Sequence, residues 1–87
     1  MSEQPKVTVY GNRTCSYCGA ARMLLTKKAV EFQDIVITDD PSLEKEMLER
    51  GVGHTVPQIF IGDIHVGGSD DLHALERQGK LDALLAA

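Results

Sequence analysis

The amino-acid sequence predicts an α/β fold, in which a four-stranded mixed sheet carries helices on both faces. Two patterns lead to this fold class. Short runs rich in β-branched residues alternate along the chain with longer segments whose apolar residues recur at helical spacing. Two of the short runs are separated by only two residues, which favours an antiparallel hairpin beside a parallel β-α-β unit. The predicted order of elements is β-α-β-α-β-β-α.

The N-terminal half supplies the β-α-β unit. Residues 6–10 alternate apolar and polar side chains and predict a strand that ends at Gly11. Residues 16–29 predict an amphipathic helix whose basic residues lie toward its C-terminal end, where they suit the helix dipole. Residues 32–38 predict the second strand, which a right-handed crossover connects to the first.

A helix and a hairpin follow. The Asp-Asp-Pro run at residues 39–41 is typical of a capped helix start, and the helix should continue to about Arg50 and end at Gly51. Residues 58–61 and 64–66 predict two strands, and the Gly-Asp pair between them favours a hairpin turn.

The last part of the chain is predicted to be helical. Ser69 is expected to cap a helix whose first turn carries Asp70 and Asp71, and Gly79 is expected to end it. Residues 80–85 predict one further short helical turn.

Composition indicates one domain that comprises residues 1–87. The hydrophobic fraction of 43% is ordinary for a globular protein, and no apolar run approaches the ~20 residues that span a bilayer. The net charge of -4 argues against a nucleic-acid partner. Because the N-terminus shows no export signal, we expect a soluble, cytoplasmic protein without a membrane partner.

The two cysteines, Cys15 and Cys18, favour redox chemistry over a structural role. A disulfide between residues three apart would restrict the unfolded chain little. A tetrahedral zinc site needs four ligands, and His54, His65 and His73 lack the spacing of the two-cysteine, two-histidine type. We expect these histidines to be surface residues without a role. A Cys-x-x-Cys pair at a helix start is instead typical of thiol-disulfide exchange.

The position of each cysteine suggests its part in the chemistry. Cys15 precedes the first helical turn and faces unpaired backbone N–H groups, which lower the pKa of a thiol. Cys18 lies within that turn and is partly covered by it. We therefore expect Cys15 to attack a disulfide and Cys18 to resolve an intermediate formed on Cys15.

Two further motifs have both a structural and a functional interpretation. The Thr-Val-Pro run at residues 55–57 is either a loop proline before a strand or, with a cis bond before Pro57, an edge on which Val56 pairs with an extended peptide. Residues 67–71 are either a turn before a capped helix or a small zwitterion site. In the second case helix-start N–H groups hold a carboxylate and Asp70 holds an ammonium.

Together the three motifs resemble the dithiol glutaredoxins, and the resemblance extends over residues 6–85. The Cys-Ser-Tyr-Cys run at residues 15–18 matches the family's Cys-Pro-Tyr-Cys, and residues 55–57 match its Thr-Val-Pro. Residues 67–72 match its Gly-Gly-x-Asp-Asp-Leu. The resemblance implies a thioredoxin fold, a cis bond before Pro57, and glutathione as redox partner. The matched residues implied to contact glutathione are Tyr17, Thr55, Val56, Pro57, Gly68, Ser69 and Asp70.

The resemblance also implies how glutathione lies. Val56 would pair with its cysteinyl backbone, Tyr17 would flank its sulfur, and Ser69 and Asp70 would bind its γ-glutamyl end. Many family members carry a lysine where this chain has Asn12, so we predict that the neighbouring Arg13 supplies a cation to the thiolate or to the glycyl carboxylate.

Two other positions qualify this expectation. Arg50 is a weaker candidate for the glycyl carboxylate, and its alternative is a solvated helix end. Ser16 replaces the family's proline, which frees a backbone N–H and makes the turn more adaptable.

Two classes of function remain open. The first is a monomeric glutathione-dependent oxidoreductase that reduces protein-glutathione mixed disulfides and protein disulfides. The second is a homodimer that holds a [2Fe-2S] cluster between the Cys15 thiolates of two chains and the thiolates of two glutathiones. In this it resembles some glutaredoxins that carry serine at the position of Ser16. A third possibility is an oxidoreductase that thioredoxin reductase reduces. The acidic segment at residues 69–71 argues against it, because this segment matches the family's glutathione-binding pattern.

Overall fold

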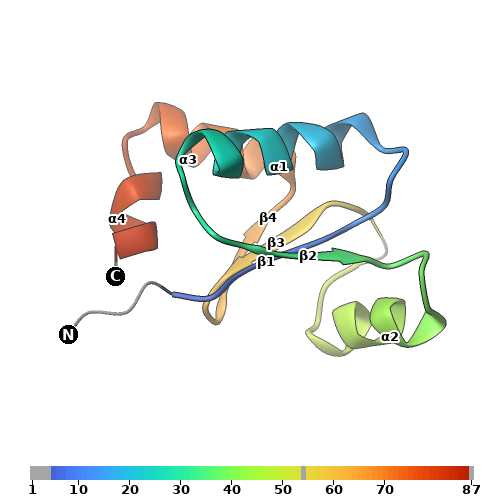
Figure 1. Ribbon diagram of the computed structural model, residues 1–87. Coiled ribbons are helices and arrows are strands. Elements are labelled where there is room, and N and C mark those ends of the chain that lie inside the picture. The colour runs from blue at the N-terminus through green and yellow to red at the C-terminus, as the bar shows by residue number, and fades with distance from the viewer. Residues whose placement is uncertain (1–4, 54, 87) are drawn as a thin grey trace.

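The computed structural model describes residues 5–53 and 55–86, and Figure 1 shows their arrangement. Four strands form one sheet in the order β2-β1-β3-β4. Strand β1 runs parallel to β2 and antiparallel to β3, and β3 runs antiparallel to β4. The predicted mixed sheet is thus confirmed. The elements are β1 (Val7–Gly11), α1 (Ser16–Lys27), β2 (Gln33–Val36), α2 (Pro41–Glu49), β3 (Gln58–Ile61), β4 (Ile64–Gly67), α3 (Ser69–Arg77) and α4 (Leu81–Ala86).

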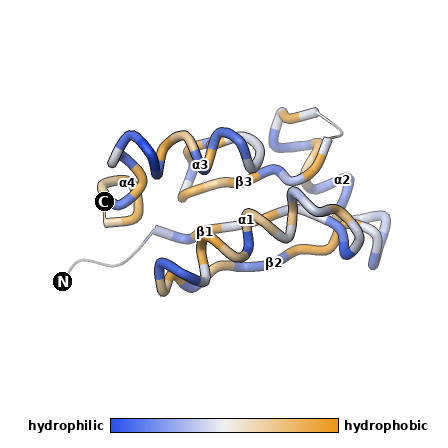
Figure 2. The backbone as a smooth tube through the Cα atoms, turned by 90° about the horizontal axis from the view of Figure 1, so that it is seen from above, coloured by the Kyte–Doolittle hydropathy of each residue, from blue (hydrophilic) through white to orange (hydrophobic). Residues whose placement is uncertain are grey.

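Helices cover both faces of the sheet, as predicted: α1 and α3 lie on one face, and α2 lies on the other (Figure 1). Because side chains alternate across a strand, β1 places Val7 and Val9 in the core with α1 and α3, and Tyr10 in the core with α2. Helix α3 alternates hydrophobic and hydrophilic residues along its turns (Figure 2), as expected of a helix with one face on the protein. No helix among the described residues is long and apolar enough to cross a membrane.

Strand β2 is shorter than the predicted span of residues 32–38. Regular pairing with β1 stops at Val36, although the Ile37 N–H still donates to the Gly11 carbonyl oxygen at 2.8 Å. Beyond the ladder, Phe32 packs against the core and Ile37 is buried, whereas Thr38 is exposed. The sequence predicted too long a strand because Phe32 and Ile37 are apolar for packing in the core and not for pairing with β1.

Helix α1 ends at Lys27, two residues earlier than predicted, because the chain turns left-handed at Ala29 (φ 58°). The Ala29 N–H donates to the Thr26 carbonyl at 3.0 Å, and the Val30 N–H donates to the Leu25 carbonyl at 3.1 Å. This pair of bonds is a Schellman motif, and its usual apolar contact is present because Val30 and Leu25 share one buried cluster. Apolar spacing cannot detect this end, since alanine normally favours helix.

Two single substitutions, one at Ala29 and one at Gly19, should each stabilise the protein. Ala29→Gly should raise the free energy of unfolding by about 0.5–1 kcal/mol, because it relieves a left-handed alanine. Gly19→Ala should raise it by a similar amount, about 0.5–1 kcal/mol, because Gly19 is helical and a Cβ there meets nothing within 4 Å. Urea unfolding measures both, and a loss of stability in either variant would contradict the backbone geometry.

Candidate active site

The chain approaches Cys15 through a turn that Asn12 organises. The Asn12 side-chain oxygen accepts hydrogen bonds from the backbone N–H groups of Thr14 (3.2 Å) and Cys15 (2.8 Å). Asparagine commonly closes such a turn after a strand. Cys15 then occupies the N-cap position of α1 with extended backbone. The sulfur is thus placed at the positive end of the helix.

The two thiols differ in exposure and acidity. Cys15 is partly exposed and Cys18 is 0% exposed. The pKa of Cys15 is lowered, first by the backbone N–H of Cys18 and further by the Cys18 thiol, the Tyr17 N–H and the charge of Arg22. Burial raises the pKa of Cys18. Cys15 therefore ionises before Cys18, as a nucleophile paired with a protonated resolving thiol requires.

Arg22 is the cation that acts on both thiols, and we did not predict it. Its side chain is 21% exposed, and it donates to the Asp34 carboxylate (2.9 Å) and to the Asn12 carbonyl (3.0 Å). Arg22 thereby connects α1, β2 and the turn before Cys15. It follows Cys18 by four residues on the same helix, a spacing that places two side chains on one face and could have indicated it.

Gly11 leaves room for this arrangement at the end of β1. A Cβ at Gly11 would lie 2.8 Å from the Cys18 sulfur and 3.1 Å from Nη2 of Arg22. The first distance is shorter than real Cβ contacts and the second is unusually tight, so the buried thiol and the guanidinium pack closely against the strand backbone.

Removing the charge at Arg22 should make Cys15 less acidic. Because the thiolate is the reactive form and Arg22 lowers the pKa of Cys15, Arg22→Gln should move the pH midpoint of Cys15 alkylation upward. Arg13→Gln provides the matched control and should leave the midpoint unchanged, since Arg13 pairs with Asp39 and is not among the groups that lower the pKa of Cys15. Iodoacetamide rates measured against pH give both midpoints, and equal midpoints for wild type and Arg22→Gln would exclude this role.

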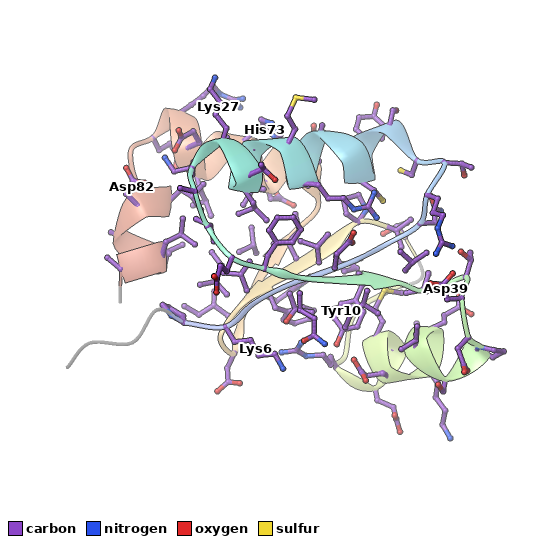
Figure 3. The ribbon with its side chains drawn as sticks, in the orientation of Figure 1. Lys6, Tyr10, Lys27, Asp39, His73 and Asp82 are labelled. Atoms are coloured by element: carbon purple, nitrogen blue, oxygen red, sulfur yellow. The ribbon has the colours of Figure 1, made fainter. Side chains whose placement is uncertain are left out.

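The structure places Arg13 on Asp39, which Figure 3 labels between β2 and α2. Both terminal guanidinium nitrogens face the carboxylate, with Nη2 2.9 Å from Oδ2, and Arg13 lowers the pKa of Asp39. The cation that acts on the Cys15 thiol in this structure is Arg22. Arg13, which we predicted for that role, instead pairs with an acid 26 residues away. Contact of Arg13 with a glycyl carboxylate stays a prediction.

Arg50 lies on the α2 face of the sheet. Its guanidinium carbon stacks 3.7 Å from the centre of the Phe60 ring, and Nη1 donates to the Tyr10 hydroxyl at 3.3 Å. It lines a cavity of about 430 Å³ with Lys6 and Glu46, separate from the residues around the cysteines. Arg50 therefore packs against the sheet and is not simply a solvated helix end.

The Thr-Val-Pro segment lies next to Cys15. The Val56–Pro57 bond is cis, as the resemblance implied, and the Val56 carbonyl oxygen is 4.0 Å from the Cys15 sulfur. The Gln58 amide donates to the Thr55 carbonyl (3.0 Å) and hydroxyl (3.1 Å). These bonds fix the segment before β3, and sequence patterns gave no indication of the Gln58 contribution.

A glycine caps helix α3, contrary to the prediction that Ser69 does so. Gly68 is the N-cap with extended backbone, and its N–H donates to the Asp71 carboxylate at 3.1 Å. Because Asp71 caps from within the helix, the Ser69 hydroxyl is not needed for the cap. The N–H groups of Ser69 and Asp70 have no intrahelical partner and are available to an anion.

The histidines also differ from expectation. His65 is exposed, but its Nε2 lies 2.7 Å from the Gln58 side-chain oxygen. His73 is half-buried and its Nδ1 contacts Ser69, so it is less exposed than the surface residue that we expected. His54 lies outside the described residues.

One cavity of about 280 Å³ brings the three motifs together. Tyr17 reaches it from α1, residues 55–58 form one wall, and the start of α3 forms another. Arg13 is the one predicted contact of glutathione that does not line this cavity. Its lining residues are Tyr17, Thr55, Val56, Pro57, Gln58, Gly68, Ser69, Asp70 and Asp71.

Three features occur together: a mixed sheet of this strand order, a Cys-x-x-Cys pair at the start of the first helix, and a cis-proline segment beside that pair. They define a thiol redox protein of the thioredoxin fold. The glutaredoxin family model matches residues 7–66. The chain therefore belongs to the glutaredoxin family, whose members are thiol oxidoreductases.

Relatives and solved structures agree with this assignment. A glutaredoxin from Pseudomonas aeruginosa is 53% identical over 95% of this chain and 99% of its own length. Glutaredoxin 3 from Escherichia coli is 47% identical over 91% of this chain and 95% of its own. The solution structure of a Brucella melitensis glutaredoxin superposes with a TM-score of 0.81, at 49% identity over 95% of this chain and 90% of that one. A buckwheat glutaredoxin-glutathione complex gives a TM-score of 0.83 at 27% identity, over 93% of this chain and 76% of that one.

Proposed function

We propose that the protein is a glutathione-dependent thiol-disulfide oxidoreductase that reduces protein-glutathione mixed disulfides and protein disulfides in the cytoplasm. The observation that carries this proposal is the cavity beside Cys15, whose lining includes both the start of helix α3, which suits an anion, and Val56. Glutathione carries an α-amino-acid head, a peptide backbone and a thiol, and these groups suit the three parts of the site in that order.

The binding mode follows from the chemistry of each wall. The Ser69 and Asp70 N–H groups and the Ser69 hydroxyl would hold the γ-glutamyl carboxylate, and the exposed Asp70 carboxylate would hold the adjacent ammonium. The Val56 backbone would pair with the cysteinyl residue, and Tyr17 would lie along the sulfur. Such binding directs the glutathione sulfur toward Cys15. The buckwheat relative, which was solved as a complex with glutathione, supports the choice of this ligand.

The reaction then requires two exchanges. The Cys15 thiolate attacks the glutathione sulfur of a mixed disulfide, and the protein substrate leaves as a thiolate that takes up a proton. A second glutathione thiolate attacks the glutathione sulfur on Cys15, which yields glutathione disulfide and restores the Cys15 thiolate. With a protein disulfide, Cys15 first bonds to the substrate, and Cys18 displaces the substrate to form the Cys15–Cys18 disulfide. Two glutathiones reduce that disulfide.

Coupled turnover tests the proposal. Glutathione, glutathione reductase and NADPH should support reduction of a glutathionylated peptide, whereas thioredoxin reductase with NADPH should not replace the glutathione system. Turnover with thioredoxin reductase alone, in the absence of glutathione, would reject it.

A glutathione-ligated [2Fe-2S] dimer is the second candidate. The donor set in one chain does not suffice, since the described residues contain no group of three or more His, Cys, Asp or Glu side chains able to hold a metal. Cys18 is buried, so each chain would supply Cys15 alone, and two glutathiones would complete the four thiolates. A structure solved in work on metal binding of glutaredoxins is 50% identical, over 97% of this chain and 91% of that one, with a TM-score of 0.72.

Anaerobic reconstitution with iron, sulfide and glutathione should then give a coloured dimer, measured by absorption and size-exclusion chromatography. Cys15→Ser should give a colourless monomer, and omission of glutathione should do the same. A coloured dimer that forms equally well without glutathione would contradict the proposed ligand set.

A further inference from the structure

His73 lies one helical turn beyond Ser69 on α3, outside the lining of the proposed glutathione cavity. Its Nδ1 is 2.8 Å from the Ser69 carbonyl oxygen and 3.3 Å from the Ser69 hydroxyl oxygen. Ser69 itself is only 5% exposed and lines that cavity. One ring nitrogen thus faces both oxygens of the residue assigned to the γ-glutamyl end.

The shorter contact determines which nitrogen carries the proton. A carbonyl oxygen only accepts hydrogen bonds, so an Nδ1 at 2.8 Å must be the donor. A donating Nδ1 has no free lone pair in the ring plane, so it cannot accept the proton of the Ser69 hydroxyl. The opposite tautomer would set an Nδ1 lone pair against the carbonyl and would also draw the hydroxyl proton away from the cavity.

His73 also borders a second cavity, separate from the proposed glutathione site. His73 and Lys27 line one cavity between α1 and α3, and Figure 3 labels them near each other there. In the neutral ring with a proton on Nδ1, Nε2 keeps its lone pair and can accept a hydrogen bond. Of the described residues that line this cavity with His73, Lys27 alone is charged.

We propose that His73 is a positioning residue for substrate: by donating Nδ1–H to the Ser69 carbonyl, it leaves the Ser69 hydroxyl proton free to donate to the α-carboxylate of a γ-glutamyl group. His73 does not touch the ligand. It limits the directions in which the hydroxyl can point, so the donor is oriented before glutathione binds. This role deepens the proposed glutathione function and rests on it.

Binding of S-methylglutathione tests the role without disulfide exchange, because the thioether cannot react. His73→Leu removes the donor and should weaken binding by about 2- to 5-fold in calorimetry, whereas His73→Asn keeps an N–H donor and should restore most of the affinity. In a Ser69→Ala background the His73→Leu change should have no further effect, as a double-mutant cycle detects. In turnover, His73→Leu should raise KM for glutathione with kcat nearly unchanged.

Distinct results separate the two levels of proposal. If the wild type does not bind S-methylglutathione and shows no glutathione turnover, the proposed function fails and the role of His73 fails with it. If the wild type binds but His73→Leu binds equally well, or weakens binding equally with and without the Ser69 hydroxyl, only the role of His73 is overturned. Nitrogen NMR of the unliganded protein gives an independent result, since a neutral His73 protonated on Nε2 would also overturn it.

Discussion

Cys15→Ser is expected to abolish reduction of a glutathionylated peptide, with turnover lower by on the order of 10³-fold or more. The reason is that Cys15 is the accessible thiol whose pKa is lowered by the Cys18 N–H, whereas Cys18 is buried and its pKa is raised. Cys18→Ser should retain most of this turnover, because the monothiol route uses Cys15 and glutathione alone. The same variant should lose reduction of protein disulfides, which requires Cys18 to displace the substrate.

Two assays separate these routes. Glutathionylated peptide reports the monothiol route, and a dithiol protein substrate such as insulin reports the other. Circular dichroism should show that both variants are folded, since serine is close in size to cysteine. Equal loss of peptide reduction in the two variants would contradict the roles assigned to the thiols.

Gly67→Ala should have the largest effect on stability, about 2–4 kcal/mol, or about 10 °C or more in Tm. Gly67 has φ 116°, and a Cβ there would overlap the Asp71 carboxylate. The substitution therefore combines backbone strain with the loss of the Asp71 bond to the Gly68 N–H. Because this bond forms the start of α3, KM for glutathione should rise as well.

Gly51→Ala isolates the first of these effects. Gly51 also has a positive φ, 84°, but a Cβ there meets nothing within 4 Å. It should cost about 1–2 kcal/mol, with KM unchanged. Equal unfolding free energies for the two variants would show that the Asp71 overlap is relieved at no cost.

Local signals in the sequence predicted much of the fold. The Asp40 side chain accepts from the Ser42 N–H, and Pro41 begins α2, as capping rules require. The hairpin around Gly62, where φ is 60°, also depends only on neighbouring residues. These elements could be predicted because their determinants lie within a few positions of one another.

The contacts that tune the site could not be predicted in this way. Arg22 meets Asp34 across 12 positions, and Arg13 meets Asp39 across 26. Both pairings depend on where β2 lies relative to β1 and α1, which periodicity does not specify. The prediction that Ser69 caps α3 was wrong for a related reason. Ser69 is a good N-cap residue by type, but the backbone at Gly67 makes Gly68 the N-cap, and the Asp71 side chain completes the cap.

The close pairing of an exposed and a buried thiol also bears on oxidative damage. Peroxide oxidises an accessible thiolate to a sulfenic acid, and further oxidation of that group is irreversible in most proteins. The Cys18 thiol lies close enough to Cys15 to lower the pKa of that thiol, so it can condense with a sulfenic acid there and expel water. We therefore expect the buried cysteine to keep the protein recoverable after peroxide exposure, because the product is a disulfide that thiols reduce.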